Sequence, residues 1–214
     1  HISHFHSPVD GMGQRMVALV DEARNEGVDV TFDQYPYAAA STVLHSLLPY
    51  WVHAGGPGTL LKRIKGRKTR DEIGDAINPM WGLDLGHYIF SHIGSAKNKE
   101  WEGRSLTELA KAKGTPMADT ICDFLIEENL DVAFVARTGN PDNIRVIAQH
   151  PAQMVGSDGI LTGEMPNPRT YGTFPYVLGQ FVREERILRM EDAVRKMTSM
   201  PAQRLGLKDR GILR

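Results

Sequence analysis

Residues 14–35 read QRMVALVDEARNEGVDVTFDQY, a helical pattern followed by a strand pattern. From Gln14 to Glu26 the apolar residues recur at close to a 3.6-residue period, which predicts an amphipathic helix that Gly27 is placed to end. From Val28 to Tyr35 apolar and polar residues alternate in the manner of a strand. With a strand expected at His1–His4, this makes strand, helix and strand within about 35 residues, the size of a βαβ unit.

A second strand pattern ends in the hexapeptide Met154-Val155-Gly156-Ser157-Asp158-Gly159. Met154 and Val155 suit a buried parallel strand, and the two glycines let the backbone turn tightly and approach a ligand closely. Reacting groups lie at the C-terminal ends of the strands in barrels of alternating strands and helices, so Asp158 is a candidate general base or metal ligand. The alternative is that its side chain caps the next turn.

The region from Pro49 to about Gly103 is rich in Gly, Pro and charge, which predicts an insertion. Its basic cluster, Lys62 to Arg70, is interpreted as a solvated helix face, because it lacks interleaved aromatic residues. The sequence predicts helices at 59–65, 69–77, from Ser105, at 116–128 and at 141–149, and strands at 87–93 and 131–136. The tail at 173–207 is expected to be helical, with Pro201 marking a break between two helices.

Composition indicates an ordinary globular protein, with 214 residues, 41% of them hydrophobic, and a net charge of -1. Such a balance provides no general attraction to nucleic acid or to an anionic membrane, and no apolar run reaches the ~18 residues of a membrane span. The single cysteine, Cys122, excludes an intramolecular disulfide and fits a cytoplasmic location; it is expected to be inert core. Because the chain opens at a strand end without an initiator Met, we expect further residues upstream.

Several polar residues are candidates for a site. His4 and His6 flank Phe5, so on an extended strand both would point to one face, where they could hold a metal ion, although surface histidines are common. Asp33 and Tyr35 share one face of the second strand, with Tyr37 two residues further on. The alternative there is a Tyr-Pro-Tyr turn with packed rings.

Two further polar side chains, Arg169 and His92, each allow two interpretations. Arg169 follows Asp158 by eleven residues and could clamp a carboxylate with two parallel hydrogen bonds; a structural ion pair is an equal alternative. His92 is expected to be a satisfied surface group rather than a metal ligand.

Taken in order, four motifs resemble the C-terminal part of the D-aminoacylases, which are N-acyl-D-amino-acid deacylases of the amidohydrolase superfamily. They are Ile2-Ser3-His4, Asp33-Gln34-Tyr35-Pro36-Tyr37 followed by Ala40-Ser41-Thr42, Gly156-Ser157-Asp158-Gly159, and Pro168-Arg169-Thr170-Tyr171-Gly172-Thr173-Phe174-Pro175. The resemblance runs over nearly the whole chain. It implies an α/β fold, a partial (β/α)8 TIM barrel, with strands six and seven in residues 1–48, an inserted α/β segment in 49–136, and the last strand and C-terminal helices in 137–214.

The resemblance also implies one or two zinc ions in the complete protein, with His4 as a metal ligand and Asp158 as the catalytic residue. It suggests His6, Tyr37, Ser41 and Arg169 near the carboxylate of the substrate. Where the deacylases commonly have Ser-His, any residue and Lys, this chain has His6 in the lysine position. One expected carboxylate contact is thereby replaced by a weaker, titratable donor.

The expected activity of the complete protein is zinc-dependent hydrolysis of the amide bond of N-acyl-D-amino acids, with a small-molecule amide as its partner and no nucleic acid or membrane. The resemblance implies that the other metal ligands precede His1, so this chain alone is expected to be inactive. Its open strand edges call for the N-terminal part of the barrel or a homo-oligomer as cover. A cyclic amide substrate, as in dihydroorotases and hydantoinases, and a non-catalytic module remain as alternatives.

Overall fold

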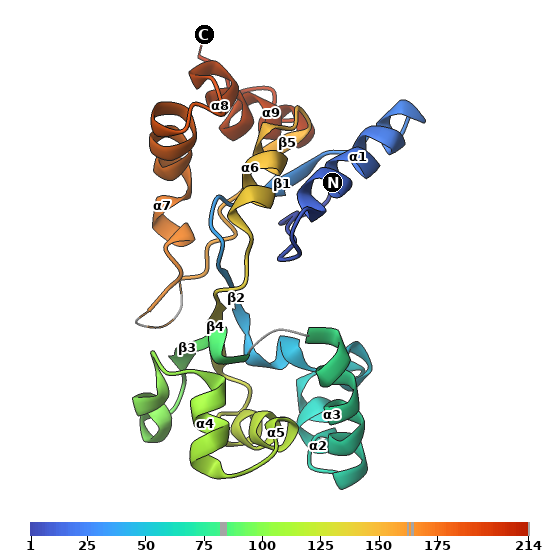
Figure 1. Ribbon diagram of the computed structural model, residues 1–214, viewed down its shortest axis with the longest axis vertical. Coiled ribbons are helices and arrows are strands. Elements are labelled where there is room, and N and C mark those ends of the chain that lie inside the picture. The colour runs from blue at the N-terminus through green and yellow to red at the C-terminus, as the bar shows by residue number, and fades with distance from the viewer. Residues whose placement is uncertain (82–84, 162, 164, 214) are drawn as a thin grey trace. The chain divides into compact units, whose positions relative to one another are not determined.

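The computed structural model describes residues 1–81, 85–161, 163 and 165–213. The chain divides into two compact units, each built from more than one stretch of sequence. The first comprises His1–Ala38, Gly139–Ile160 and Pro168–Arg214, blue and gold to red in Figure 1, and the second comprises Ala39–Thr138 and Leu161–Asn167. The expected insertion, 49–136, falls inside the second unit, which also takes in residues 39–48.

The first unit is organised around short parallel strands. Strand β1 (Phe32–Gln34) pairs in parallel with β5 (Gln153–Val155), with Phe32 opposite Gln153, and Ile2 forms a parallel bridge with Phe32 on the other side. The lateral order is therefore Ile2, β1, β5, which is also the order along the chain. Because the three segments run in one direction, their C-terminal ends meet at one edge. The α/β class is confirmed, and the described strands do not close into a barrel.

Helices α1 (Met12–Asn25) and α6 (Pro141–Gln149) pack against each other and cover these strands. The contact is close at Gly13, where a Cβ would lie 2.8 Å from the Cα of Asn143, and the Asn143 side chain accepts a hydrogen bond from the Gly13 N–H. Phe32 is fully buried beside Val20 and Ile147. Burying a phenylalanine of this kind is worth about 1.5–3 kcal/mol.

The C-terminal region is helical, as the sequence predicts, but its break lies elsewhere. It consists of α7 (Arg169–Tyr176), the π-helix η5 (Val177–Glu184), α8 (Met190–Met197) and α9 (Ser199–Arg204). The break expected at Pro201 is wrong, since α8 and α9 separate at Thr198, with φ -131° and ψ -83°. Pro201 sits in the first turn of α9, where a missing N–H costs no helical hydrogen bond.

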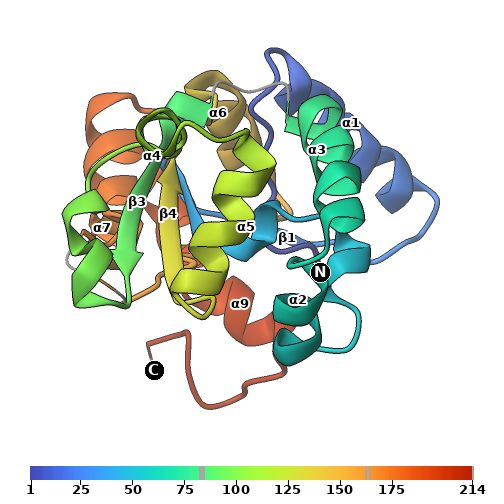
Figure 2. The same ribbon diagram turned by 90° about the horizontal axis from the view of Figure 1, so that it is seen from below.

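The second unit contains an antiparallel sheet in the order β2 (Ala40–Val43), β4 (Val132–Ala136), β3 (Tyr88–Ile93). Figure 2 shows β3 beside β4, and their register shifts between Phe90 and His92. The sequence predicts β3 and β4 correctly but misses β2, which is only four residues long.

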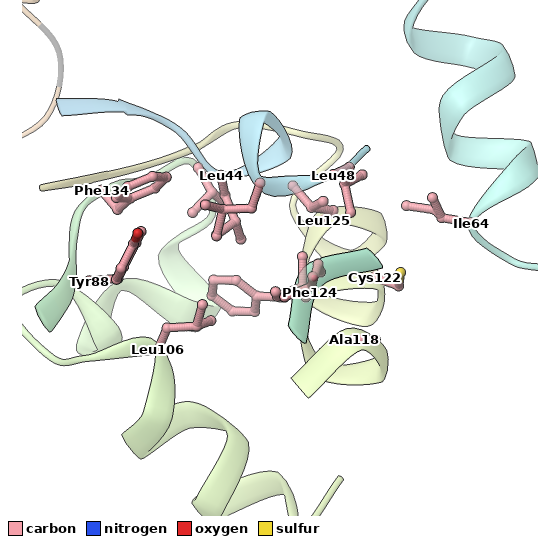
Figure 3. Packing of buried hydrophobic residues seen from close by; sticks show 14 of the residues in the cluster. Leu44, Leu48, Ile64, Tyr88, Leu106, Ala118, Cys122, Phe124, Leu125 and Phe134 are labelled. Atoms are coloured by element: carbon pink, nitrogen blue, oxygen red, sulfur yellow. The ribbon is translucent and has the colours of Figure 1, made fainter. Parts of the chain in front are cut away.

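The helices of the second unit pack on this sheet around one apolar core, part of which Figure 3 shows, with Phe124 and Leu125 near Leu44 and Leu106. Cys122 is fully buried in this core, and burial raises the pKa of its thiol to about 11, which confirms it as inert. The capping box that Ser105 and Glu108 predict is present at the start of α4. The elements are η1 (Leu44–Leu47), η2 (Tyr50–His53), α2 (Pro57–Arg63), α3 (Arg67–Trp81), η3 (Leu85–His87), η4 (Ala96–Trp101), α4 (Leu106–Lys113) and α5 (Met117–Glu127).

The basic cluster on α2 and α3 is only partly a solvated face. Arg63 donates hydrogen bonds to the carbonyls of Trp51, Val52 and Ala54. Arg70 pairs with Asp119 and Asp123 of α5. The interpretation is wrong for these two arginines, because their planar guanidinium groups tie the helices to neighbouring segments, while the lysines of the cluster remain exposed.

No helix in the described part of the chain is both long enough and apolar enough to cross a membrane.

Candidate functional site

His4 lies at the C-terminal end of the first strand segment of the first unit, and its backbone is left-handed, with φ 41°. Its N–H donates a hydrogen bond to Oδ1 of Asp33 over 2.8 Å, while the N–H of Phe5 donates to the Asp33 carbonyl. The extended strand expected through His6 is therefore absent. Because the His4 N–H donates to the side chain of Asp33, the strand-like alternation of side chains ends at His4. The imidazole of His4 is exposed.

His6 does not share the environment of His4. Its ring stacks on Tyr35 with 4.2 Å between the centroids, and burial lowers the pKa of His6 to about 4. One ring nitrogen hydrogen-bonds the Tyr35 backbone, and Nε2 meets no hydrogen-bond partner among the described residues. A neutral imidazole whose N–H donates to a carbonyl has an acceptor as its other nitrogen. At neutral pH His6 thus presents an acceptor, where the sequence suggested a titratable donor.

Asp158 follows β5 and is also left-handed, with φ 45°. Its carboxylate Oδ2 is 2.8 Å from a guanidinium nitrogen of Arg169, the first residue of α7. The Asp158 side chain is 40% exposed, whereas that of Arg169 is 1% exposed. Because Asp158 remains open to solvent and Arg169 does not, the ion pair can orient a carboxylate that a small molecule can still reach.

The guanidinium of Arg169 also lies 4.3 Å from the centroid of the Tyr35 ring. Tyr35 therefore contacts both Arg169 and His6. Burial raises the pKa of Tyr35, and the positive charge of Arg169 acts in the opposite direction. Of the two readings of Arg169, the structural ion pair is the one formed here, and its contact with a substrate carboxylate stays a prediction.

Tyr37 belongs to the first unit and packs against α7. Its ring lies 4.9 Å from that of Tyr176, and a Cβ at Gly172 would collide with the Tyr37 hydroxyl oxygen. The glycine of Tyr171-Gly172-Thr173 is therefore what lets α7 approach this phenol. Burial raises the pKa of Tyr37.

Ser41 and His92 lie in the second unit. Ser41 is in β2, opposite Val135 of β4. His92, in β3, places Nε2 2.9 Å from Oδ1 of Asp131, but its buried Nδ1 meets no hydrogen-bond partner among the described residues, so it is only in part the satisfied surface group expected.

Asp33 was placed by the sequence on one face with Tyr35 but was given no role. In the structure it lies on the central strand and touches the strand end on each side. Its Oδ2 is 2.7 Å from Nε2 of His1, and a Cβ at Gly156 would lie 3.1 Å from its Oδ1. A carboxylate at the end of a strand, as in Phe32-Asp33-Gln34, is the signal that points to it.

The donor set fits part of a zinc site. An exposed imidazole at His4 and a half-exposed carboxylate at Asp158 are groups that zinc accepts. They end strands that flank β1, which sets them apart by about two strand spacings, or ~10 Å at the backbone. No group of three His, Cys, Asp or Glu side chains comes together within the described residues, so a zinc site here needs ligands in addition to these.

Comparison with known proteins gives a consistent set of relatives, although no family model matches the chain. The chain is 34% identical over 211 residues to N-acyl-D-glutamate deacylase and 38% identical over 206 residues to D-aminoacylase, both from Alcaligenes xylosoxydans xylosoxydans. These alignments cover 95% and 96% of the chain but 33% and 34% of the relatives. The chain thus spans about a third of the length of the curated relatives it matches.

Solved structures agree. An N-acyl-D-glutamate deacylase from Bordetella bronchiseptica, complexed with zinc and a phosphonate inhibitor that mimics the tetrahedral intermediate, matches with a TM-score of 0.71 and 27% identity over 100% of this chain and 37% of that chain. A D-aminoacylase studied for its binuclear metal centre matches with a TM-score of 0.69 and 27% identity over 98% of this chain and 36% of that chain.

Proposed function

From the premise that this chain is a homologue of N-acyl-D-glutamate deacylase and D-aminoacylase, we propose that the protein containing it hydrolyses the amide bond of N-acyl-D-amino acids with the help of zinc. The observation that carries the proposal is the position of His4 and Asp158, which end parallel strands on either side of β1. Strand ends of this kind hold the reacting groups of barrel enzymes.

In this proposal the segment at Ile2, β1 and β5 are strands six, seven and eight of a (β/α)8 barrel, and the second unit is the insertion before the last strand. The remaining strands, and the metal ligands that the described residues do not supply, belong to the part of the full-length protein that corresponds to the unmatched part of the relatives. A complete site would hold one or two zinc ions. We expect the chain by itself to be inactive.

His4 would hold zinc through its exposed imidazole, and bound zinc would polarise the amide carbonyl of the substrate and lower the pKa of a water molecule. Asp158 takes the proton of the attacking water on its carboxylate and returns it to the leaving amine, which departs as the C–N bond breaks. Arg169 keeps the Asp158 carboxylate oriented through the 2.8 Å ion pair. The half-exposed position of Asp158 leaves room for both the water and the amine.

Tyr37, Arg169 and His6, all in the first unit, form the substrate side of the proposal. Arg169 has the charge and the planar donors that match an amino acid carboxylate, but its side chain is 1% exposed and paired with Asp158, so it reaches such a carboxylate only when this ion pair opens. Tyr37 offers a phenol donor. Burial lowers the pKa of His6 to about 4, so at pH 7 it is neutral and brings no positive charge to the carboxylate of the substrate.

Hydrolysis of a cyclic amide is not favoured, since the relatives that match nearly the whole chain are deacylases of N-acyl-D-amino acids. A non-catalytic role would require a full-length protein that binds no zinc.

The test is Asp158→Asn in the full-length protein. Asn adopts the left-handed conformation of this residue without added strain and has nearly the same shape, but it cannot accept a proton from water. We expect the variant to keep its zinc and to lose hydrolysis of N-acetyl-D-amino acids by about 10²–10⁴-fold, as for a removed general base. Zinc content and thermal unfolding of both proteins are the controls. A variant that turns over substrate at the original rate would exclude this role.

A further inference from the structure

We infer that Asp33 is a positioning residue for the metal site: its carboxylate holds the backbone of His4 in the left-handed conformation and thereby sets the direction of the His4 imidazole. The inference rests on the proposed function, in which His4 is a zinc ligand. It assigns a task to a residue that the proposed function leaves without a role.

The first step is the conformation of His4. A residue with a Cβ adopts a positive φ at an energetic cost, and such residues persist where surrounding contacts enforce them. The φ of His4 is 41°, and its N–H donates to Asp33 Oδ1 over 2.8 Å. The N–H of Phe5 meanwhile donates to the Asp33 carbonyl over 2.8 Å, so one residue binds two successive amides of the loop.

The second step is that Asp33 is itself held from both sides. Its Oδ2 is 2.7 Å from Nε2 of His1, whose Nδ1 is 2.9 Å from the Thr31 hydroxyl. On the other side Gly156 leaves no gap, because a Cβ there would lie 3.1 Å from Oδ1 and 3.2 Å from Cγ of Asp33. The carboxylate is fixed between the strand end that carries His4 and the strand end that leads to Asp158.

The third step is the direction in which the His4 imidazole points. Without the acceptor at Asp33, His4 gains by relaxing toward an extended φ, and the Cα–Cβ bond then turns away from its present course. An imidazole that must meet further ligands tolerates little such rotation. The supporting groups of metal ligands typically change metal affinity by about 10–100-fold when removed.

The experiment compares Asp33→Ala with Asp33→Asn in the full-length protein. Asn keeps an oxygen for the His4 N–H, and its amide can donate to His1 in the other imidazole tautomer. We expect zinc to dissociate at least about tenfold more readily from Asp33→Ala and to bind Asp33→Asn within about threefold of the original affinity. The visible absorption of the cobalt-substituted protein, which reports ligand geometry, should change in Asp33→Ala only.

Unchanged zinc affinity and an unchanged cobalt spectrum in Asp33→Ala would overturn the inference, as would equal losses in both variants. If Asp33→Ala does not fold, Gly156→Ala replaces it. The added methyl group presses on the Asp33 carboxylate, so weaker zinc binding supports the inference and full affinity overturns it.

The variant His4→Asn distinguishes a failure of this inference from a failure of the proposed function. Asn tolerates the left-handed backbone but lacks the imidazole that is proposed to bind zinc. If His4→Asn binds zinc as tightly as the original protein, the proposed metal site is wrong and the inference falls with it. If His4→Asn loses zinc while Asp33→Ala keeps it, only the role of Asp33 is wrong.

Discussion

At the scale of single residues, the site depends on backbone conformations that the sequence shows only indirectly. His4 and Asp158 are two of the five described non-glycine residues with positive φ. The sequence did point to Asp158, because a carboxylate between glycines after an apolar run indicates a strand end. It could not show that Asp33 binds the His4 N–H, since that contact joins residues 29 positions apart. Local alternation therefore placed His4 and His6 on one face, and the structure separates them.

The contact between Gly172 and Tyr37 makes a prediction at the same scale. In Gly172→Ala the new methyl group would collide with the Tyr37 hydroxyl oxygen. The helix preference of Ala over Gly offers at most about 1 kcal/mol, and overpacking costs about 1–3 kcal/mol, so we expect the free energy of unfolding to fall. Gly179→Ala is the matched control, because its Cβ would meet no atom closer than 3.8 Å. Chemical denaturation of the two variants checks this. A Gly172→Ala variant whose free energy of unfolding does not fall would contradict the packing described for Tyr37.

At the scale of elements, most helices and the longer strands follow from periodicity and caps. Helix α6 begins and ends at the residues the sequence predicts, Pro141 and Gln149. The failures have local causes. Strand β2 is too short to show an alternating pattern. Proline occurs both at helix breaks and in the first turn of a helix, so the sequence alone does not tell which of the two Pro201 marks. The inward contacts of Arg63 and Arg70 depend on neighbours distant in sequence.

Helix α8 is tied to the turn before β5 by a buried lysine, which predicts a pH dependence. Lys196 Nζ donates to the carbonyls of His150 and Gln153, and burial lowers its pKa from 10.5 to about 8. Between these two values the unfolded chain binds the proton that the folded protein has lost. Stability therefore rises with pH from about 8 to 10.5, by at most ~1.4 kcal/mol per pH unit, and the cost of burying the charge is fully present below pH 8.

Denaturation of the protein and of Lys196→Met across this range measures the effect, since other titrating groups cancel in the difference. We expect the free energy of unfolding of the original protein to increase with pH relative to that of Lys196→Met. A difference that stays constant from pH 7 to 10.5 would show that the hydrogen bonds keep the ammonium charged.

At the scale of the whole molecule, four ordered motifs carried the family resemblance, and the relatives found by sequence and by structure agree with it. The two-unit organisation could be predicted only coarsely, because the return of residues 161–167 to the second unit follows from packing and not from composition. In the proposed site the chain supplies the imidazole of His4 and the carboxylate of Asp158, and no third His, Cys, Asp or Glu joins them within the described residues.

The most direct test of the central claim is an assay of the full-length protein on N-acetyl-D-amino acids and their L-enantiomers, before and after removal of metal with a chelator. We predict hydrolysis of D-substrates, its loss on chelation, its return with added zinc, and little turnover of L-substrates. A zinc-loaded protein that leaves every N-acetyl-D-amino acid intact, or a metal-free protein that hydrolyses them at the original rate, would contradict the account.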